Sequence, residues 1–446
     1  MSSELVLRAG EAGQAGQAAE SPSKGGGGGG GRGGGNGSGE ERGFAEVLVD
    51  AVTRGNSVVV TVLAFVCAIV VGGLIIAFTD TTVLHAWGNL FTAPGKAFAT
   101  AWDTASGAYV AMFEGAVFNP HTVSAAFHGG SIATVFNPLS ETAVNATPII
   151  LTGLAVAIAF RAGLFNIGAA SQFIGGAMIA GWIGFAVHLP FVLHAVAAVA
   201  GGLVGGAIVG GLVGFLKART GAHEVIVTIM LNYVMEYLLV YLLGLTVFRR
   251  PGNPNPISPT IAPNAVLPHL FGSTLRVNVG FLIALVAAAA VWWVLNRTTT
   301  GFELRTVGAN PKAARSAGMS PERTWIVIMV LAGALAGLAG AAVVQGTNFD
   351  VAPQINGTYN VYAITVALLG RASPGGTVLA SLLFGALRAG GVAMQASTQV
   401  PVDIVTVIEA LIVLFVAAPP LMRAMFRLRP PRAGTGEQLE ARGWGG

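Results

Sequence analysis

Polar side chains recur every fourth residue within one otherwise apolar stretch. Thr228, Asn232 and Glu236 would lie on one stripe of a helix, and Glu224 continues that stripe to the helix start. A carboxylate at the centre of a bilayer costs roughly 2.5–3.5 kcal/mol on insertion scales. Glu236 is therefore expected to face a wet cavity or a protein partner. The stripe is either part of a solute path or an interhelical hydrogen-bond network that includes Arg388.

A second polar group lies in a short turn between two apolar stretches. Asn166, Ser171 and Gln172 supply donors and acceptors there, and Gly163 and Gly168 allow the backbone to bend. Unwound backbone at membrane depth occurs where it lines a cavity, and such breaks often hold substrate. The alternative is an ordinary tight cytoplasmic turn. Together the two groups predict a substrate path formed by Asn166, Ser171, Gln172, Thr228, Asn232, Tyr233 and Glu236.

A third segment, residues 296–324, forms the one substantial internal loop on the predicted cytoplasmic side. Asn310 and Pro311 are a good N-cap and first helical residue, and Gly318 is a good stop, which predicts a short helix over Pro311–Ala317. Such a helix suits docking of a cytosolic partner. Capping alone is equally typical of a connector.

The elements that position these groups must be membrane helices. Charged residues make up 10% of the chain, against about 25% in soluble domains, and the mean hydropathy is +0.70. We expect an all-α polytopic membrane protein with about ten transmembrane helices. The predicted spans are 57–78, 143–160, 172–187, 191–216, 225–245, 279–295, 325–345, 355–370, 376–393 and 402–419.

Two segments, 161–171 and 355–370, are predicted to be broken or re-entrant. The first is too apolar for an ordinary loop, and the second contains Asn356, Gly357 and Asn360.

The distribution of Lys and Arg predicts that both chain ends are cytoplasmic. With ten spans, fourteen basic residues lie in cytoplasmic turns and the C-terminal tail, and four lie in external segments. Omitting span 355–370 would place the arginine-rich tail outside. The predicted organisation is a disordered Gly-rich cytoplasmic tail (1–43), a transmembrane domain (44–422) and a basic cytoplasmic tail (423–446).

The external segments and the glycine spacing lead to further structural predictions. Residues 79–142 are predicted to form interfacial amphipathic helices, and the six prolines of 246–278 predict a stiff loop that is either a docking surface or a connector. Glycines at small intervals in spans 191–216 and 325–345 predict closely packed helices.

The sequence motifs of several enzyme classes are absent. The chain has no G-x-x-x-x-G-K-[ST], so it is not expected to hydrolyse ATP, and it has neither H-E-x-x-H nor G-x-S-x-G. The seven histidines lack metal-ligand spacing, so no metal site is predicted. Nucleic acid is not an expected partner, because the basic residues follow membrane topology.

Four motifs resemble those of ABC importer permeases of the ribose, branched-chain amino acid and nucleoside family. Gly308-Ala-Asn310-Pro-Lys-Ala313-Ala314-Arg-Ser-Ala-Gly318-Met resembles the coupling segment of that family. The stretches Gly163–Gly168, Glu224–Tyr233 and Leu369–Gly375 resemble the simple-sugar and nucleoside branch. The likeness covers roughly residues 55–420. One departure is that Ala170 and Ser171 stand where the branch usually has Glu and Gly.

The resemblance implies a multi-pass permease subunit in the bacterial inner (plasma) membrane, forming the path for a nucleoside or simple sugar. Its implied partners are a cytosolic ATP-binding subunit, a second permease chain (a heterodimer) and an extracytoplasmic solute-binding lipoprotein. ATP would be used by the partner, with no cofactor in this chain. The coupling residues would be Gly308, Asn310, Ala313, Ala314 and Gly318.

The alternative hypothesis is a secondary transporter or channel in which Glu236 is the ion or proton site. No carboxylate other than Glu236 is expected within a membrane span, and this argues against that alternative.

Overall fold

The computed structural model describes residues 57–398, 400–417 and 425–426, and over these residues it contains helices and no β-strand. The predicted boundaries at 43 and 422 therefore lie outside the described residues. The longer helices are α2 (Ser57–Thr79), α4 (Pro94–Ala116), α6 (Asn137–Arg161), α7 (Ala169–Ala186), α8 (Phe191–Thr220), α9 (Glu224–Gly244), α10 (Val279–Arg297), α13 (Pro321–Val343), α15 (Pro374–Thr398) and α16 (Asp403–Ala417). Shorter helices are α3 (Thr81–Gly88), α5 (Pro120–Phe127), α11 (Thr299–Ala309), α12 (Pro311–Ser316) and α14 (Tyr359–Leu369).

Eight segments of the described chain are long and apolar enough to cross a membrane, and they correspond to eight of the predicted spans. The other two predicted spans contain α14 and α16, the latter described through Ala417. The prediction of an all-α polytopic membrane protein is confirmed.

Both predicted interruptions are present. The helix α6 ends at Arg161 and α7 begins at Ala169, which leaves a seven-residue turn without helix. The helix α14 begins only at Tyr359, after a run of turns over 353–358. Its 11 residues rise about 16 Å, roughly half of the hydrocarbon core of a bilayer. The segment therefore crosses the membrane only together with the turns before it.

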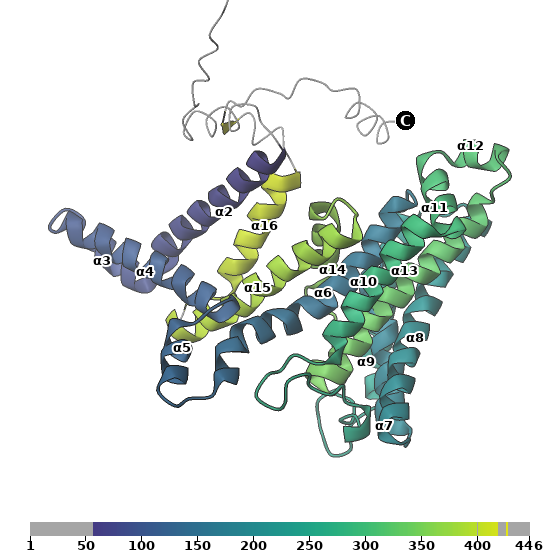
Figure 1. Cartoon of the computed structure of the whole chain (residues 1–446), viewed down its shortest axis with the longest axis horizontal. Helices are drawn as coiled ribbons and strands as arrows, with labels where there is room; N and C mark the ends of the chain where they lie inside the picture. The colour runs from purple at the N-terminus through teal and green to yellow at the C-terminus, as the bar shows by residue number, and fades with distance from the viewer. Residues whose placement is uncertain (1–56, 399, 418–424, 427–446) are drawn as a thin grey trace, which may run out of the picture. The chain divides into compact units, whose positions relative to one another are not determined.

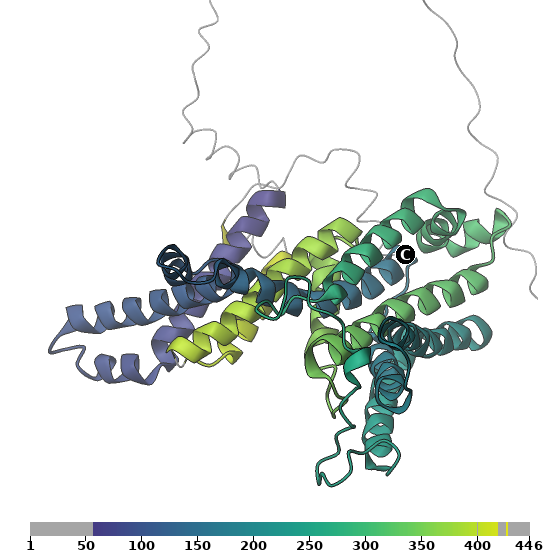
Figure 2. The same cartoon turned by 60° about the horizontal axis from the view of Figure 1, so that its bottom comes forward.

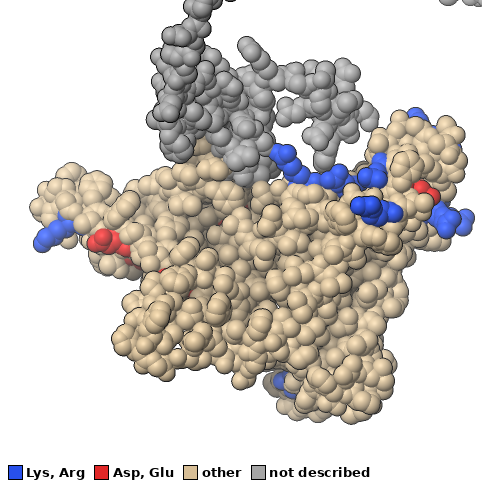
Figure 3. All heavy atoms as spheres, in the orientation of Figure 1, with Lys and Arg blue, Asp and Glu red and all other residues tan. Residues whose placement is uncertain are grey.

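The described ends of the membrane domain lie at one edge of the bundle. The start of α2 and the end of α16 share the edge that carries α12 (Figure 1). Most of the visible Lys and Arg side chains gather along the same edge (Figure 3). This agrees with the positive-inside prediction and assigns the edge with α12 to the cytoplasm.

The closest helix packing joins α8 and α13 through glycines. A Cβ added at Gly206 would come within 2.6 Å of the Gly337 Cα, and one at Gly210 within 2.9 Å of the Gly333 Cα. Only glycine permits two helix backbones to approach so closely in lipid. The prediction from glycine spacing is confirmed. The neighbouring Gly205 instead faces the backbone of Gly175 on α7, so α8 has a glycine face toward each of two helices.

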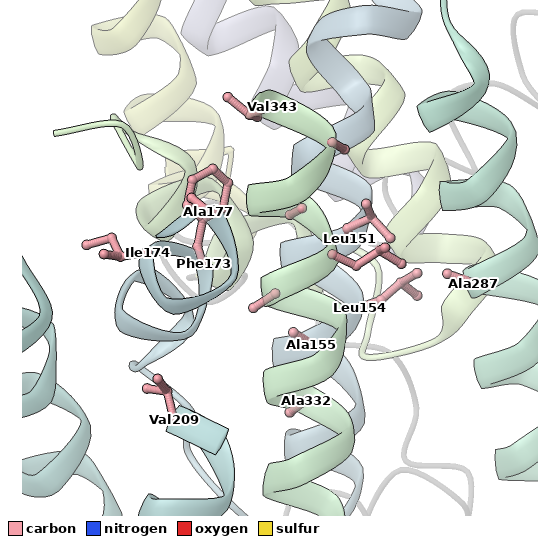
Figure 4. Close-up of a cluster of buried hydrophobic side chains, with 14 of the residues drawn as sticks. Leu151, Leu154, Ala155, Phe173, Ile174, Ala177, Val209, Ala287, Ala332 and Val343 are labelled. Atoms are coloured by element: carbon pink, nitrogen blue, oxygen red, sulfur yellow. The ribbon is translucent and has the colours of Figure 1, made fainter. Parts of the chain in front are cut away.

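The main apolar core lies around α13. Side chains of α6, α7 and α13 meet there, including Leu151, Leu154, Phe173 and Ala332 (Figure 4). A second cluster joins α2, α4, α15 and α16 through residues such as Ala68, Ala108 and Ile408.

The external segments are helical or tied to the bundle. Residues 79–142 form α3, α4, α5, a 3-10 turn and the start of α6, and α3 and α4 lie beside α2 (Figure 2). That these helices lie at the membrane interface stays a prediction. The proline-rich loop 246–278 is bonded to the end of the seventh span: Ser258 N–H donates to the Val351 carbonyl, and Arg250 pairs with Asp350 at 2.9 Å. These contacts tie the loop to the residues that follow α13.

Candidate functional site

The predicted short helix on the cytoplasmic edge is present as α12. The Oδ1 atom of Asn310 accepts hydrogen bonds from the backbone N–H groups of Lys312 (3.0 Å) and Ala313 (3.1 Å). The helix ends before Gly318, whose φ of 83° lies in the left-handed region where glycine is favoured. Both capping predictions are confirmed, although the helix ends one residue earlier than predicted.

Most of α12 projects into solvent. Ala313 and Gly318 are exposed, whereas Ala314 is fully buried and anchors the helix to the protein below. Arg315 pairs with Glu322 at the start of α13, which links the short helix to a membrane span. A rigid helix with small exposed residues is suited to fit a groove of another protein.

The residues before α12 lie directly against the turn between α6 and α7. A Cβ added at Gly163 would lie 3.1 Å from the Gly308 carbonyl oxygen, and one at Gly308 would lie 2.5 Å from the Arg161 carbonyl oxygen. Gly163 also has a φ of 70°. The two glycines thus bring two of the sequence motifs into backbone contact.

A third motif is joined to the same turn by Arg161. Its Nε atom donates to the carbonyl of Ala372 at 2.9 Å, and its Nη2 atom to the carbonyl of Arg371 at 3.4 Å. Both acceptors belong to the turn between α14 and α15 and have positive φ values. Segments far apart in sequence therefore meet at the cytoplasmic edge.

The polar side chains of the α6–α7 turn bond to one another. Asn166 and Gln172 are fully buried and exchange two side-chain hydrogen bonds, of 3.0 and 3.2 Å. The Ser171 hydroxyl donates to the Gly168 carbonyl at 2.8 Å. These side chains stabilise the turn, so they are not open donors toward a cavity.

One residue of the α9 stripe completes this network. Asn232 accepts from the Ser171 N–H at 3.0 Å and donates to the Ile167 carbonyl at 3.1 Å. It thereby satisfies an N–H group in the first turn of α7, where Gly168 provides no capping side chain. The buried Thr228 packs against Gly168 from the same face of α9.

The other two residues predicted on α9 are not part of the network. Tyr233 is 56% exposed, and Glu236 is partly buried. Tyr237 and Tyr241 continue the exposed aromatic face at 72% and 65%. Of the eight candidate spans, α9 has the smallest buried share. Of the stripe, Asn232 therefore bonds to the turn, whereas Glu236 lies outside that hydrogen-bond network.

Arg388 lies in a polar cavity on the opposite side of the membrane from α12. Its Nη1 atom donates to the Thr358 hydroxyl at 2.9 Å, and the cavity is also lined by Asn145, Asn348 and Tyr359. Spacing did not predict this site, because its residues come from helices far apart in sequence. The available signal was a single arginine, Arg388, within a span.

The structure also corrects the count of intramembrane carboxylates. Glu409 lies on α16 within span 402–419 and is 2% exposed. The expectation that no carboxylate other than Glu236 lies within a span is therefore wrong. Glu409 lies between Ile408 and Ala410 in an apolar run, so no polar spacing marks it in the sequence.

The comparisons with known proteins fit this arrangement. Residues 139–417 match the family described as branched-chain amino acid transport system / permease component. The chain belongs to this permease family. It is 37% identical over 289 residues to a guanosine ABC transporter permease of Bacillus subtilis, covering 63% of this chain and 81% of the relative. No solved structure matches.

Two further relatives are named for different solutes, and their sequence identity to this chain is nearly the same. A glucose ABC transporter permease of Haloferax volcanii is 36% identical over 286 residues, 62% of this chain and 75% of the relative. A nucleoside ABC transporter permease of Lactococcus lactis is 36% identical over 297 residues, 64% and 81% of the two chains. The chain is thus a multi-pass permease subunit of an ABC importer in the bacterial inner membrane. The family implies an ATPase and a substrate-binding partner.

Proposed function

We propose that this permease subunit carries a nucleoside or a simple sugar, powered by ATP that a separate subunit binds and hydrolyses. The support is the naming of similar permeases for guanosine, nucleosides and glucose. Because identities to the nucleoside and glucose permeases are nearly equal, both solute classes belong to the proposal. A lipoprotein on the external side would deliver the solute.

The observation that carries the coupling role is the contact between Gly308 and Gly163. The exposed α12 would dock on the ATPase through Ala313 and Gly318, with Asn310 and Ala314 fixing its geometry. Movement of α12 would reach the α6–α7 turn through the two glycines. From there the Asn166–Gln172 pair and Asn232 connect to α7 and α9. In this proposal Asn166, Ser171, Gln172 and Thr228 shape the path by holding the turn.

The outer face of α9 is the proposed contact with the second permease chain. A half-buried Glu236 facing lipid would be costly, and a protein neighbour or a wet path removes that cost. Tyr233 and Tyr237 beside it are typical of protein interfaces because their rings are large and their hydroxyls polar. In this proposal the solute path runs where the two permease chains meet. The second chain has a different sequence, so the pair is a heterodimer.

The test is uptake by proteoliposomes that contain the complete importer. Radiolabelled adenosine, ribose and glucose are supplied outside together with the binding protein, and ATP is enclosed or omitted. We expect uptake of at least one of these solutes only with ATP. Uptake driven by an ion gradient without the ATPase would overturn the proposal and favour a secondary transporter with Glu236 as its ion site.

A further inference from the structure

The helix α14 is too short to cross a bilayer alone, and turns with left-handed residues flank it on both sides. Gln354 (φ 58°) and Gly357 (φ 43°) lie in the turns before it, and Arg371 (φ 52°) and Ala372 (φ 49°) lie in the turn after it. Apart from the glycine, these residues carry a Cβ and adopt such a conformation only where their surroundings hold it. A helix between two such turns can change its position while its own hydrogen bonds stay intact.

The last residue of α6, Arg161, holds the cytoplasmic end of α14. Its Nε atom donates to the Ala372 carbonyl at 2.9 Å and its Nη2 atom to the Arg371 carbonyl at 3.4 Å. A rigid guanidinium that donates to two neighbouring carbonyl groups fixes their direction as well as their distance. The backbone N–H of Ala372 in turn donates to the Ala367 carbonyl of α14 at 2.7 Å. Arg161 is therefore joined to the last turn of α14 without a further side chain between them.

The backbone of the same arginine lies against the segment before α12. An added Cβ at Gly308 would lie 2.5 Å from the Arg161 carbonyl oxygen and 2.9 Å from the Ala162 carbonyl carbon. The main chain of Arg161 thus contacts the coupling segment, while its side chain contacts the turn after α14. A displacement of Gly308 by a partner of α12 would displace Arg161 directly.

The helix α15, which follows the same turn, is fixed more firmly than α14. Both helices pack on α6 (Figure 1). An added Cβ at Gly385 of α15 would lie 2.8 Å from a carbonyl oxygen of α6, and one at Gly390 would overlap a carbonyl oxygen of α4. The helix α14 contains no glycine, and its buried Ala363 and Ala367 meet apolar side chains of α6 and α7. Helices packed through small side chains can slide by small amounts, so α14 is the element that can follow Arg161.

The external end of α14 reaches the polar cavity. Tyr359, the first residue of α14, lines this cavity of about 180 Å³. The preceding Thr358 accepts a hydrogen bond from Arg388 of α15 at 2.9 Å. One end of α14 is thus held by an arginine of α6 and the other by an arginine of the firmly packed α15. A shift of α14 along its axis would move Thr358 and Tyr359 relative to Arg388 and change the opening of the cavity.

We propose that Arg161 is the positioning residue that makes α14 follow the segment before α12, so that ATP binding by the partner subunit changes the opening of the external polar cavity. The proposal rests on the proposed coupling of this permease to a separate ATPase. It adds a second branch to that coupling, through α14, beside the branch through α7 and α9. The alternative is that Arg161 only closes the end of α14, a structural role that would not depend on nucleotide.

The test uses thiol labelling, because Cys67 is the only cysteine of the chain. Proteoliposomes hold the complete importer with Cys67→Ala in this chain, and Asn356→Cys places one thiol in the turn before α14. The matched control is Ser273→Cys, exposed in the external loop 246–278. A non-hydrolysable ATP analogue is enclosed or omitted, and a membrane-impermeant maleimide is added outside. Only importers whose ATPase faces the enclosed nucleotide are then labelled at their external side.

We expect the enclosed analogue to change the labelling rate of Asn356→Cys several-fold and to leave that of Ser273→Cys unchanged. Adding Arg161→Met removes the donors but keeps a long side chain, so the labelling rate should become the same with and without the analogue. Arg161→Lys should keep part of the change. The control is Arg305→Met, because the exposed Arg305 donates within its own helix, to the Gly301 carbonyl at 3.3 Å. This control should keep the full change.

Solute uptake and ATP hydrolysis are measured in parallel with ATP enclosed. Arg161→Met should continue to hydrolyse ATP while the solute moved per ATP falls several-fold. A nucleotide-dependent change that survives Arg161→Met, or that is absent from the parent chain, would overturn the proposal. Loss of hydrolysis in Arg161→Met would also overturn it, because Arg161 would then serve docking of the ATPase. Uptake by the parent importer that needs no ATP would instead refute the proposed function, so the two failures are distinguishable. Unchanged labelling of Ser273→Cys confirms that each variant is folded.

Discussion

Gly163 and Gly308 contact each other through their backbones, with a Cβ at Gly163 placed only 3.1 Å from the Gly308 carbonyl oxygen. The contact joins the segment before α12 to the turn that begins α7. Neither residue could carry a side chain without moving one of these segments. The cytoplasmic helix and the membrane spans therefore meet without an intervening flexible side chain.

Gly163→Ala should reduce ATP-driven uptake more than its backbone strain explains. The matched control is Gly221→Ala, because Gly221 has a similar φ of 68° but nothing within 4 Å of an added Cβ. Both substitutions carry the left-handed penalty of about 1–2 kcal/mol, and only Gly163→Ala also displaces Gly308. Uptake is measured at equal membrane abundance. Equal activity of the two variants would contradict coupling through the glycine contact.

The exposed residues of α12 should be required for docking rather than for folding. Ala313→Asp and Gly318→Trp should uncouple ATP hydrolysis from uptake, because each changes the exposed surface of the helix. The control is Thr299→Asp, an exposed change at the start of α11 on the same edge. Hydrolysis and uptake are measured together in proteoliposomes. Normal uptake by both α12 variants would count against the coupling assignment.

A substitution of Glu236 can distinguish ATP-driven import from ion-coupled transport. Glu236→Gln keeps the shape of the side chain and removes its charge, so an ATP-driven permease should retain uptake within a few-fold. An ion-coupled transporter should lose it, because a neutral amide cannot bind and release the coupling ion or proton. Uptake is compared with and without ATP and with and without an imposed pH gradient. Loss of all uptake in Glu236→Gln, together with gradient-driven uptake in wild type, would favour the alternative.

Much of the fold could be predicted because the bilayer imposes simple rules on the chain. Apolar length, glycine spacing and the position of basic residues located the spans and the cytoplasmic edge. Asn310, Pro311 and Gly318 predicted α12 because helix caps are local. These rules depend only on neighbours in sequence or on the surrounding solvent.

The candidate sites were less predictable because they depend on tertiary contacts. Helical periodicity placed Thr228, Asn232 and Glu236 on one stripe, but it could not show that Asn232 caps α7 while Glu236 takes no part in that cap. Likewise, no local pattern joins Arg388 of α15 to Thr358, to whose hydroxyl it donates a hydrogen bond. A single charged residue in an apolar helix shows that a partner is needed without showing which one.

The cap that Asn232 provides for α7 should contribute measurably to stability. Asn232→Ala leaves the Ser171 N–H and the Ile167 carbonyl without this partner, and an unsatisfied buried group costs about 1–3 kcal/mol. We expect a lower unfolding temperature in detergent for Asn232→Ala. The adjacent Tyr233→Phe is the control, because Tyr233 is exposed and keeps its ring. Equal unfolding temperatures would show that water replaces Asn232 at the turn, and the turn would then be open toward the solute path.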